Sequence, residues 1–245
     1  MPVNGESDSR QPSVASLRSG SPVVCLKQEV PWAIEQYRIA RTKLAHHPLK
    51  PRLIVVTSAS PGDGKTVSAI NLAAIFALRS DANVLLVEAD IRRSSIAKLL
   101  GVAETPGIAN VLNGECELNE AMVQTEQLPR LFVLPAGAVS TNPAELLDSP
   151  KWPQLCDIFR ERFAFTIIDA PPAAAVADYT LIEARCDGVV FVVRPNNTDR
   201  NLFTMARKVI APAKTLGVLM NGADDWFLWK TAEQYYGYSG PRREP

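Results

Sequence analysis

The segment RLIVVTSASPGDGKTVSAI, residues 52–70, decides the fold because it joins an apolar run to a glycine turn and then to a helical pattern. The first part is β-branched and apolar on both faces, as in a strand buried within a parallel sheet. In the turn, Gly62 and Gly64 let the backbone bend tightly, so that several N–H groups face one point. A helix beginning at Lys65 would add its positive N-terminal end. The segment therefore predicts an anion-binding loop.

The rest of the chain repeats this alternation of strand and helix. Five more short apolar runs follow, at residues 83–90, 130–137, 165–172, 188–195 and 216–223. The segments between them are long enough for crossover helices. This order predicts an α/β fold, doubly wound, with a mostly parallel sheet and helices on both faces, but it leaves the order of the strands open. Apolar residues at three- and four-residue steps predict a further helix over residues 31–47, before the first strand.

Composition limits the function and the setting of the chain. Its 245 residues, 47% of them hydrophobic, suit one large domain. The 26 Lys and Arg balance 26 Asp and Glu, so we expect no nucleic acid partner. Four scattered cysteines and two adjacent histidines argue against a disulfide scaffold and a zinc site. With no secretory signal and no apolar run near the ~20 residues of a membrane helix, we expect a cytoplasmic protein.

The two ends of the chain differ from its middle. Residues 1–28 are rich in serine and proline and predict a disordered arm, whereas residues 29–230 form the predicted nucleotide-binding domain. Residues 231–245 predict a flexible tail. Three of the five tyrosines lie in this tail: Tyr235, Tyr236 and Tyr238. They are either modification sites or aromatic residues that pack against a neighbouring surface.

The glycine turn predicts a site for a nucleoside triphosphate. Its expected contacts are Pro61, Gly62, Asp63, Gly64, Lys65, Thr66 and Val67. Lys65 suits the β- and γ-phosphates, and the Thr66 hydroxyl suits Mg²⁺. The full pattern G-x4-G-K-[ST] would have glycine where this chain has Ala59. A plain glycine turn before a helix is the alternative interpretation.

Three acids follow two other apolar strands: Glu88, Asp90 and Asp169. In an open α/β sheet the ligand lies outside the carboxyl ends of the strands, so these acids should converge near the loop. We expect them to be catalytic together with Lys65. Mg²⁺, which prefers oxygen ligands, should be held by Thr66, Asp90 and Asp169. The alternative is that the acids cap the helices that follow them.

These motifs together resemble the bacterial tyrosine kinases of capsule and exopolysaccharide export, which are relatives of the ParA and MinD ATPases. The resemblance rests on SASPGDGKTVSAINLA, EADIRR and IIDAPP, and on NPAELLDS (142–149) and CDGVVFVVRPNNTDR (186–200). It implies a P-loop fold that uses ATP and Mg²⁺, and an autokinase that regulates polysaccharide polymerisation and export. It also implies that the tail tyrosines accept phosphate in trans, from the site of a neighbouring subunit.

The resemblance implies further sites and partners. Glu35, Arg38 and Arg41 reproduce the spacing E-x2-R-x2-R, which in the family lies on a helix that joins subunits into a ring-like homo-oligomer. An ordinary solvated helix face is the alternative. Asn221 matches a position that contacts adenine in related ATPases, or it is a turn asparagine. Without a membrane segment, such a kinase needs a separate membrane adaptor of the chain-length-regulator type at the inner face of the membrane.

The chain departs from the family at Glu88, where the motif has aspartate. One extra methylene moves a carboxylate by roughly 1.5 Å. A misplacement near 1 Å can cost about a hundredfold in rate. We therefore expect slow transfer, and we expect Glu88→Asp to raise autophosphorylation. Two other functions stay open: an ATP-binding assembly switch with little or no kinase activity, and a ParA- or MinD-type ATPase.

Overall fold

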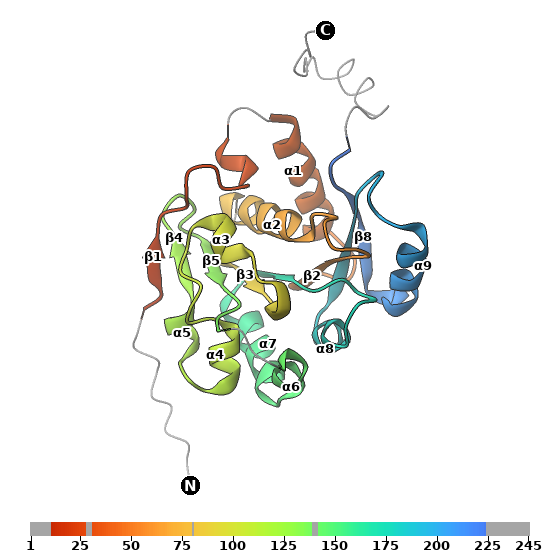
Figure 1. Cartoon of the computed structure of the whole chain (residues 1–245). Helices are drawn as coiled ribbons and strands as arrows, with labels where there is room; N and C mark the ends of the chain where they lie inside the picture. The colour runs from red at the N-terminus through yellow and green to blue at the C-terminus, as the bar shows by residue number, and fades with distance from the viewer. Residues whose placement is uncertain (1–10, 28–30, 80, 139–141, 224–245) are drawn as a thin grey trace.

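The computed structural model describes residues 11–27, 31–79, 81–138 and 142–223, which form one sheet with helices on both of its faces (Figure 1). The strands of this sheet are β1 (Ser13–Ala15), β2 (Leu53–Ser58), β3 (Val84–Glu88), β4 (Val123–Thr125), β5 (Leu131–Leu134), β6 (Phe165–Asp169), β7 (Gly188–Val193) and β8 (Thr215–Met220). Their order is β1-β4-β5-β3-β6-β2-β7-β8. Neighbouring strands are parallel except β4 and β5. The predicted doubly wound, mostly parallel sheet is confirmed.

The helices divide between two hydrophobic clusters, one on each face of the sheet (Figure 1). One cluster holds side chains of α1 (Pro31–Ala45), α2 (Lys65–Arg79) and α3 (Ile96–Leu100). The other holds side chains of α4 (Ile108–Asn113), α5 (Leu118–Ala121), α6 (Pro143–Asp148), α7 (Lys151–Arg162), α8 (Asp178–Ala184) and α9 (Arg200–Val209). Three short 3-10 turns complete the described elements: η1 (Val24–Leu26), η2 (Ile91–Arg93) and η3 (Pro212–Lys214). None of the described helices is both long and apolar enough to span a membrane.

The apolar runs read from the sequence become strands because they are buried on both faces. Every residue of β2 and β3 is buried, and each of the six predicted runs overlaps a strand. The helices predicted at residues 31–47 and after the glycine turn are α1 and α2. Two strands were not predicted, β1 and β4, which are three residues long and lie together at one edge of the sheet.

The prediction of a disordered arm over residues 1–28 is wrong for residues 11–27, which are folded. β1 pairs with β4, and the side chains of Leu17 and Val23 are buried in the cluster under α2. Asn71 of α2 accepts a hydrogen bond from Val24 N–H and donates one to the Pro22 carbonyl. The segment is polar on average, but its two buried side chains and these hydrogen bonds offset the entropy of ordering it. The folded domain therefore begins well before residue 29.

The sheet order brings the predicted acids to one place. β6 lies between β3 and β2, so Asp169 pairs in register with Glu88 on one side and with Val56 on the other. Because these strands are parallel, their carboxyl ends meet at one edge, beside the glycine turn that follows β2. The fold thus places the acids next to the predicted anion-binding loop.

Candidate functional site

The phosphate loop, residues 61–64, connects β2 to α2, and both of its glycines have left-handed backbone angles. The φ angle is 88° at Gly62 and 90° at Gly64. A Cβ atom at Gly64 would lie only 1.8 Å from Nδ2 of Asn221. Both the backbone and the space therefore require glycine there. Pro61 and Gly62 are exposed, so the loop is open to solvent at the start of α2.

Lys65 is the centre of a buried cluster of charges at the end of this loop. Its Nζ lies 2.7 Å from Oδ2 of Asp90 and 3.6 Å from Oδ1 of Asp169. The Thr66 hydroxyl is 3.5 Å from the same Nζ. Asp90 is 3% exposed and Asp169 is 1% exposed, so both interactions lie largely away from solvent. The structure therefore brings together four of the residues predicted for the nucleotide site.

The cluster keeps its lysine charged. Burial alone lowers the pKa of Lys65, but attraction to Asp169 and Asp90 outweighs it, and the pKa lies above its ordinary value. Burial raises the pKa of Asp169, which the positive charge of Lys65 and the Thr66 hydroxyl only partly offset. An ammonium held between two carboxylates is a fixed positive charge beside the anion-binding loop.

The same residues fit a magnesium ion that shares its coordination with phosphates. Oδ1 of Asp169 is buried and accepts no hydrogen bond from the described residues. Thr66, Asp90 and Asp169 offer a hydroxyl and two carboxylates, the hard oxygen ligands that Mg²⁺ uses with phosphate oxygens and water. In the described part of the chain, no group of three or more His, Cys, Asp or Glu side chains could hold a metal by itself. The donor set suits a nucleotide-bound ion better than a resident one.

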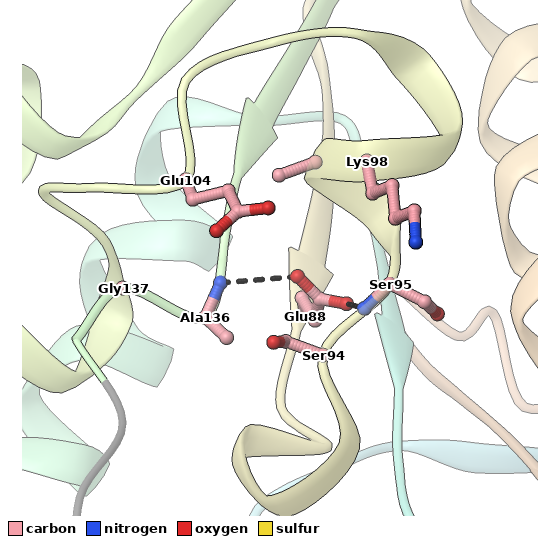
Figure 2. Close-up of a pocket in the computed structure, with 8 residues that line it drawn as sticks. Glu88, Ser94, Ser95, Lys98, Glu104, Ala136 and Gly137 are labelled. Atoms are coloured by element: carbon pink, nitrogen blue, oxygen red, sulfur yellow. Dashed lines mark hydrogen bonds between the residues drawn. The ribbon is translucent and has the colours of Figure 1, made fainter.

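Glu88, for which the sequence predicts a catalytic role, has other hydrogen-bond partners than Lys65. Its carboxylate accepts hydrogen bonds from main-chain N–H groups: Ser95 and Ile96 at the start of α3, the latter at 2.6 Å, and Ala136 after β5, at 3.2 Å. Figure 2 shows the carboxylate between these two segments. The extra methylene of glutamate lets it bridge them. Glu88 therefore ties β3 to α3 and to the segment after β5.

The hollow beside Glu88 is too small for a substrate. It is lined by Glu88, Ser94, Ser95, Ala97, Lys98, Glu104, Ala136 and Gly137 (Figure 2). Its volume of ≈ 10 Å³ has room for about one water molecule. Burial raises the pKa of Glu88, against the effect of the backbone hydrogen bonds that its carboxylate accepts. The carboxylate of Glu88 is thus buried and held by main-chain N–H groups.

Comparison with known proteins gives the loop and the charge cluster a family. A family model described as an AAA domain matches residues 51–199. Tyrosine-protein kinase YwqD of Bacillus subtilis (strain 168) is 34% identical over 212 residues, which cover 85% of this chain and 86% of YwqD. The chain belongs to the bacterial tyrosine-protein kinase family.

Solved structures of tyrosine kinases and of a cell-division ATPase share the fold. The kinase domain of the Escherichia coli tyrosine kinase ETK is 27% identical, with a TM-score of 0.76 over 87% of this chain and 84% of that one. The chimerical protein CapA2B2 is 28% identical, with a TM-score of 0.78 over 88% of this chain and 96% of the chimera. The cell-division ATPase MinD of Pyrococcus furiosus is 25% identical, with a TM-score of 0.57 over 71% and 74% of the two chains. The fold is that of a P-loop NTPase, which implies nucleotide binding.

The motif Glu35, Arg38 and Arg41 lies on α1. Glu35 and Arg38 are exposed and form an ion pair at 3.2 Å within the helix. Together with Ile39, Thr42 and Lys43, the three motif residues line an open surface hollow. An exposed pair of this kind contributes little to the stability of one subunit. Glu35 and Arg38 thus lie exposed on α1, and Arg41 is half-buried beside them.

Other predicted residues of the site divide into three groups. The tyrosines Tyr235, Tyr236 and Tyr238 lie outside the described residues. Val67 is half-buried in the first turn of α2. Asp63 and Asn221, by contrast, have partners inside the protein: the Asp63 carboxylate is fully buried, and Asn221 Nδ2 donates to the Asp63 carbonyl at 3.0 Å.

Two features of the site were not predicted from the sequence. Arg92, just after the Asp90 turn, makes a two-pronged bridge to the buried Asp178 at the start of α8, at 2.8 and 3.1 Å. Asn197 and Thr198 donate hydrogen bonds to the Asp63 carboxylate. Arg92 lies in the EADIRR motif, and Asn197 and Thr198 lie in RPNNTDR, so the sequence marks these three residues. It does not mark their partners, Asp178 and Asp63, which are distant in the sequence.

Proposed function

We propose that this chain is an ATP-dependent protein-tyrosine kinase that phosphorylates tyrosines of its own C-terminal segment in trans and regulates polysaccharide polymerisation and export. Its membership of the tyrosine-protein kinase family supports the reaction class. The observation that carries the proposal is the position of Lys65, between Asp90 and Asp169 at the end of the phosphate loop. That arrangement supplies the fixed charges that phosphoryl transfer needs.

Each residue of the cluster has a proposed task. The loop N–H groups and Lys65 bind the phosphates of ATP, and Lys65 stabilises negative charge that develops on the transferred group. Thr66, Asp90 and Asp169 would hold Mg²⁺, which supplies electrostatic stabilisation to the β- and γ-phosphates when bound. The chain thus provides positioning and charge neutralisation.

The acceptor needs orientation more than a strong base. A tyrosine hydroxyl has an ordinary pKa near 10, so a carboxylate removes its proton only late in the transfer. Asp90 and Asp169 are the candidates for orienting the phenol, because they lie at the end of the loop. We assign no such task to Glu88, because its carboxylate accepts hydrogen bonds from main-chain N–H groups.

Transfer in trans requires a neighbouring subunit, and we propose that α1 helps to form it. The exposed Glu35 and Arg38, with the half-buried Arg41, would meet a second copy in a ring-like homo-oligomer, so that the tail tyrosines of one subunit enter the site of the next. A separate membrane adaptor of the chain-length-regulator type would bring the ring to the inner face of the membrane. No nucleic acid partner is proposed.

One experiment separates this function from its alternatives. Purified chain is incubated with Mg-ATP, and phosphotyrosine is mapped by mass spectrometry for wild type and Lys65→Met. We expect phosphate on Tyr235, Tyr236 or Tyr238 in wild type and none in the variant. Free phosphate without phosphotyrosine would indicate a MinD-type ATPase. Bound ATP without either product would indicate an assembly switch.

A further inference from the structure

The aspartate inside the phosphate loop is hard to explain as a nucleotide contact. Asp63 is 0% exposed, and a carboxylate in an anion-binding loop repels phosphate. Each of its oxygens has a partner: Oδ2 accepts from Ser60 N–H at 2.9 Å, and Oδ1 accepts from Asn197 Nδ2 at 2.9 Å and from the Thr198 hydroxyl at 2.8 Å. A buried charge with three donors is built for a structural or positioning task.

The turn that donates to Asp63 is itself fixed. It follows β7, and both Asn197 N–H and Thr198 N–H donate to the Arg194 carbonyl, at 3.1 and 2.9 Å. Thr198 Oγ1 accepts from Arg194 N–H at 2.8 Å. Since that hydroxyl accepts from Arg194, its own proton is free to point at Asp63. The turn therefore presents preset donors to the phosphate loop.

Two carbonyl groups of the phosphate loop also accept side-chain hydrogen bonds. Arg194 Nη1 donates to the Gly62 carbonyl at 3.4 Å, and Asn221 Nδ2 donates to the Asp63 carbonyl at 3.0 Å. In a trans peptide the C=O of one residue and the N–H of the next point in opposite directions. Holding these two carbonyls on the protein side turns the N–H groups of Asp63 and Gly64 toward the opposite side, as an anion cradle requires.

We propose that Asp63 is a positioning residue for nucleotide binding, clamped by the turn after β7 through Asn197 and Thr198 so that the phosphate loop is set before the nucleotide arrives. It acts through the loop backbone and touches no phosphate. This role rests on the nucleotide site of the proposed function and assigns to the motif at residues 186–200 a task at that site. The repulsion between carboxylate and phosphate is the cost of this arrangement, and the oriented N–H groups outweigh it.

Removing the charge of Asp63 distinguishes a positioning role from simple filling of space, because the two predict opposite changes in the affinity for Mg-ADP. Asp63→Asn removes the repulsion but sets an NH₂ group against one of the donors. If positioning dominates, Mg-ADP binding weakens, and we expect at least tenfold by calorimetry. If Asp63 only fills space, binding is unchanged or tighter, which would overturn the proposal.

Variants of the turn test the same clamp without touching the phosphate loop. Thr198→Val removes the hydroxyl at nearly constant shape and should also weaken Mg-ADP binding about tenfold, and Thr198→Ser should recover most of that loss. The control is Asp199→Ala, one residue on, which removes the Oδ1 that caps α9 through the N–H groups of Asn201 and Leu202. It should lower the melting temperature and leave the dissociation constant within twofold of wild type.

Mg-ADP binding tests the clamp on Asp63, and phosphotyrosine formation tests the kinase activity, so either can fail without the other. If Asp63→Asn does not fold, Thr198→Val decides, and a dissociation constant within twofold of wild type refutes the clamp. In the double variant, Asp63→Asn with Thr198→Val, the loss should not exceed that of the stronger single variant, because one interaction is removed twice. A wild-type chain that binds Mg-ADP but forms no phosphotyrosine would refute the kinase and leave the clamp standing.

Discussion

Two neighbouring regions at the carboxyl end of β3 use the same chemistry for different purposes. Asp90 meets a side chain that carries charge, the ammonium of Lys65 at 2.7 Å. Glu88, two residues earlier, meets the main-chain N–H groups of α3 and of the segment after β5. Both carboxylates are buried and both belong to one motif. Their partners separate a residue paired with the lysine of the phosphate loop from one that ties the end of β3 to α3 and to the segment after β5.

The difference teaches how to weigh an acid at a strand end. A carboxylate paired with a lysine at the phosphate loop can change its partner. The lysine can then pair with phosphates and the carboxylate with a metal ion. A carboxylate that satisfies several buried N–H groups cannot leave them without a desolvation cost. Replacing Asp90 should therefore mainly lower the rate of phosphorylation, and replacing Glu88 should mainly lower the stability.

The largest expected effect is on the rate of Asp90→Asn. Asparagine keeps the size of the side chain, and its oxygen still accepts from Arg93 N–H, but the charge beside Lys65 is lost. We expect tyrosine phosphorylation to fall by about 10²-fold, with a small change in melting temperature. Initial rates with radiolabelled ATP give the first quantity and thermal unfolding gives the second.

The matched variant on the other side of this comparison is Glu88→Gln. It should lose more stability than Asp90→Asn and less activity per folded molecule. An equal loss of rate in the two variants would erase the distinction between the two acids.

The next largest effect is expected on the stability of the Glu88→Asp variant. The shorter side chain falls roughly 1.5 Å short, so it cannot reach both α3 and Ala136 N–H. Leaving a buried N–H group unpaired should lower the free energy of unfolding by about 2 kcal/mol. Urea denaturation measures it, with the exposed Glu104→Asp in the same hollow as control, expected within about 0.5 kcal/mol of wild type.

This outcome opposes the expectation from the sequence, in which aspartate at position 88 improves catalysis. A Glu88→Asp variant of unchanged stability and higher phosphorylation rate would restore the catalytic interpretation. The motif alone could not decide between them, because the donors at Ser95, Ile96 and Ala136 are main-chain groups that no sequence pattern marks.

Much of the fold was predictable because its central strands are buried on both faces. Such strands are continuous apolar runs, and β2 and β3 stand out in the sequence for that reason. β1 and β4 have three residues each, and their pairing depends on partners more than a hundred residues apart. The segment around Leu17 and Val23 was misjudged for the same reason: average composition hides two side chains that reach the core.

The site was predictable to the extent that it is local. The glycine turn, Lys65 and Thr66 are consecutive, and parallel strands bring Asp90 and Asp169 to the same edge. The clamp on Asp63 was not predictable, because it joins the phosphate loop to a turn more than 130 residues later. Strand order had to be known before those two loops could be placed together.

The smallest effect concerns Asp187, the counterpart of Glu88 just before β7. Its Oδ2 accepts from Arg52 and Leu53 N–H, both at 2.8 Å, and Arg160 donates to Oδ1 at 2.9 Å. Burial pushes the pKa of Asp187 up, but these hydrogen bonds outweigh it and the pKa lies below its ordinary value, whereas that of Glu88 lies above. Two causes differ. Glu88 is 1% exposed and the Asp187 side chain 27%, and Asp187 pairs with the positive charge of Arg160, whereas Glu88 is repelled by the negative charge of Asp169.

The sign of the pH dependence follows from that lowered pKa. The stabilisation by Asp187 is complete above its ordinary value, about 4, and is lost as the pH falls through the lower pKa of the folded state. Asp187→Asn should therefore cost about 0.5–1 kcal/mol near pH 7. Urea denaturation of both proteins from pH 7 to pH 3 should show a constant difference down to about pH 5 and a shrinking one below. A difference that grows on acidification would mean that the pKa of Asp187 is raised like that of Glu88, and the contrast between the half-buried and the buried carboxylate would fail.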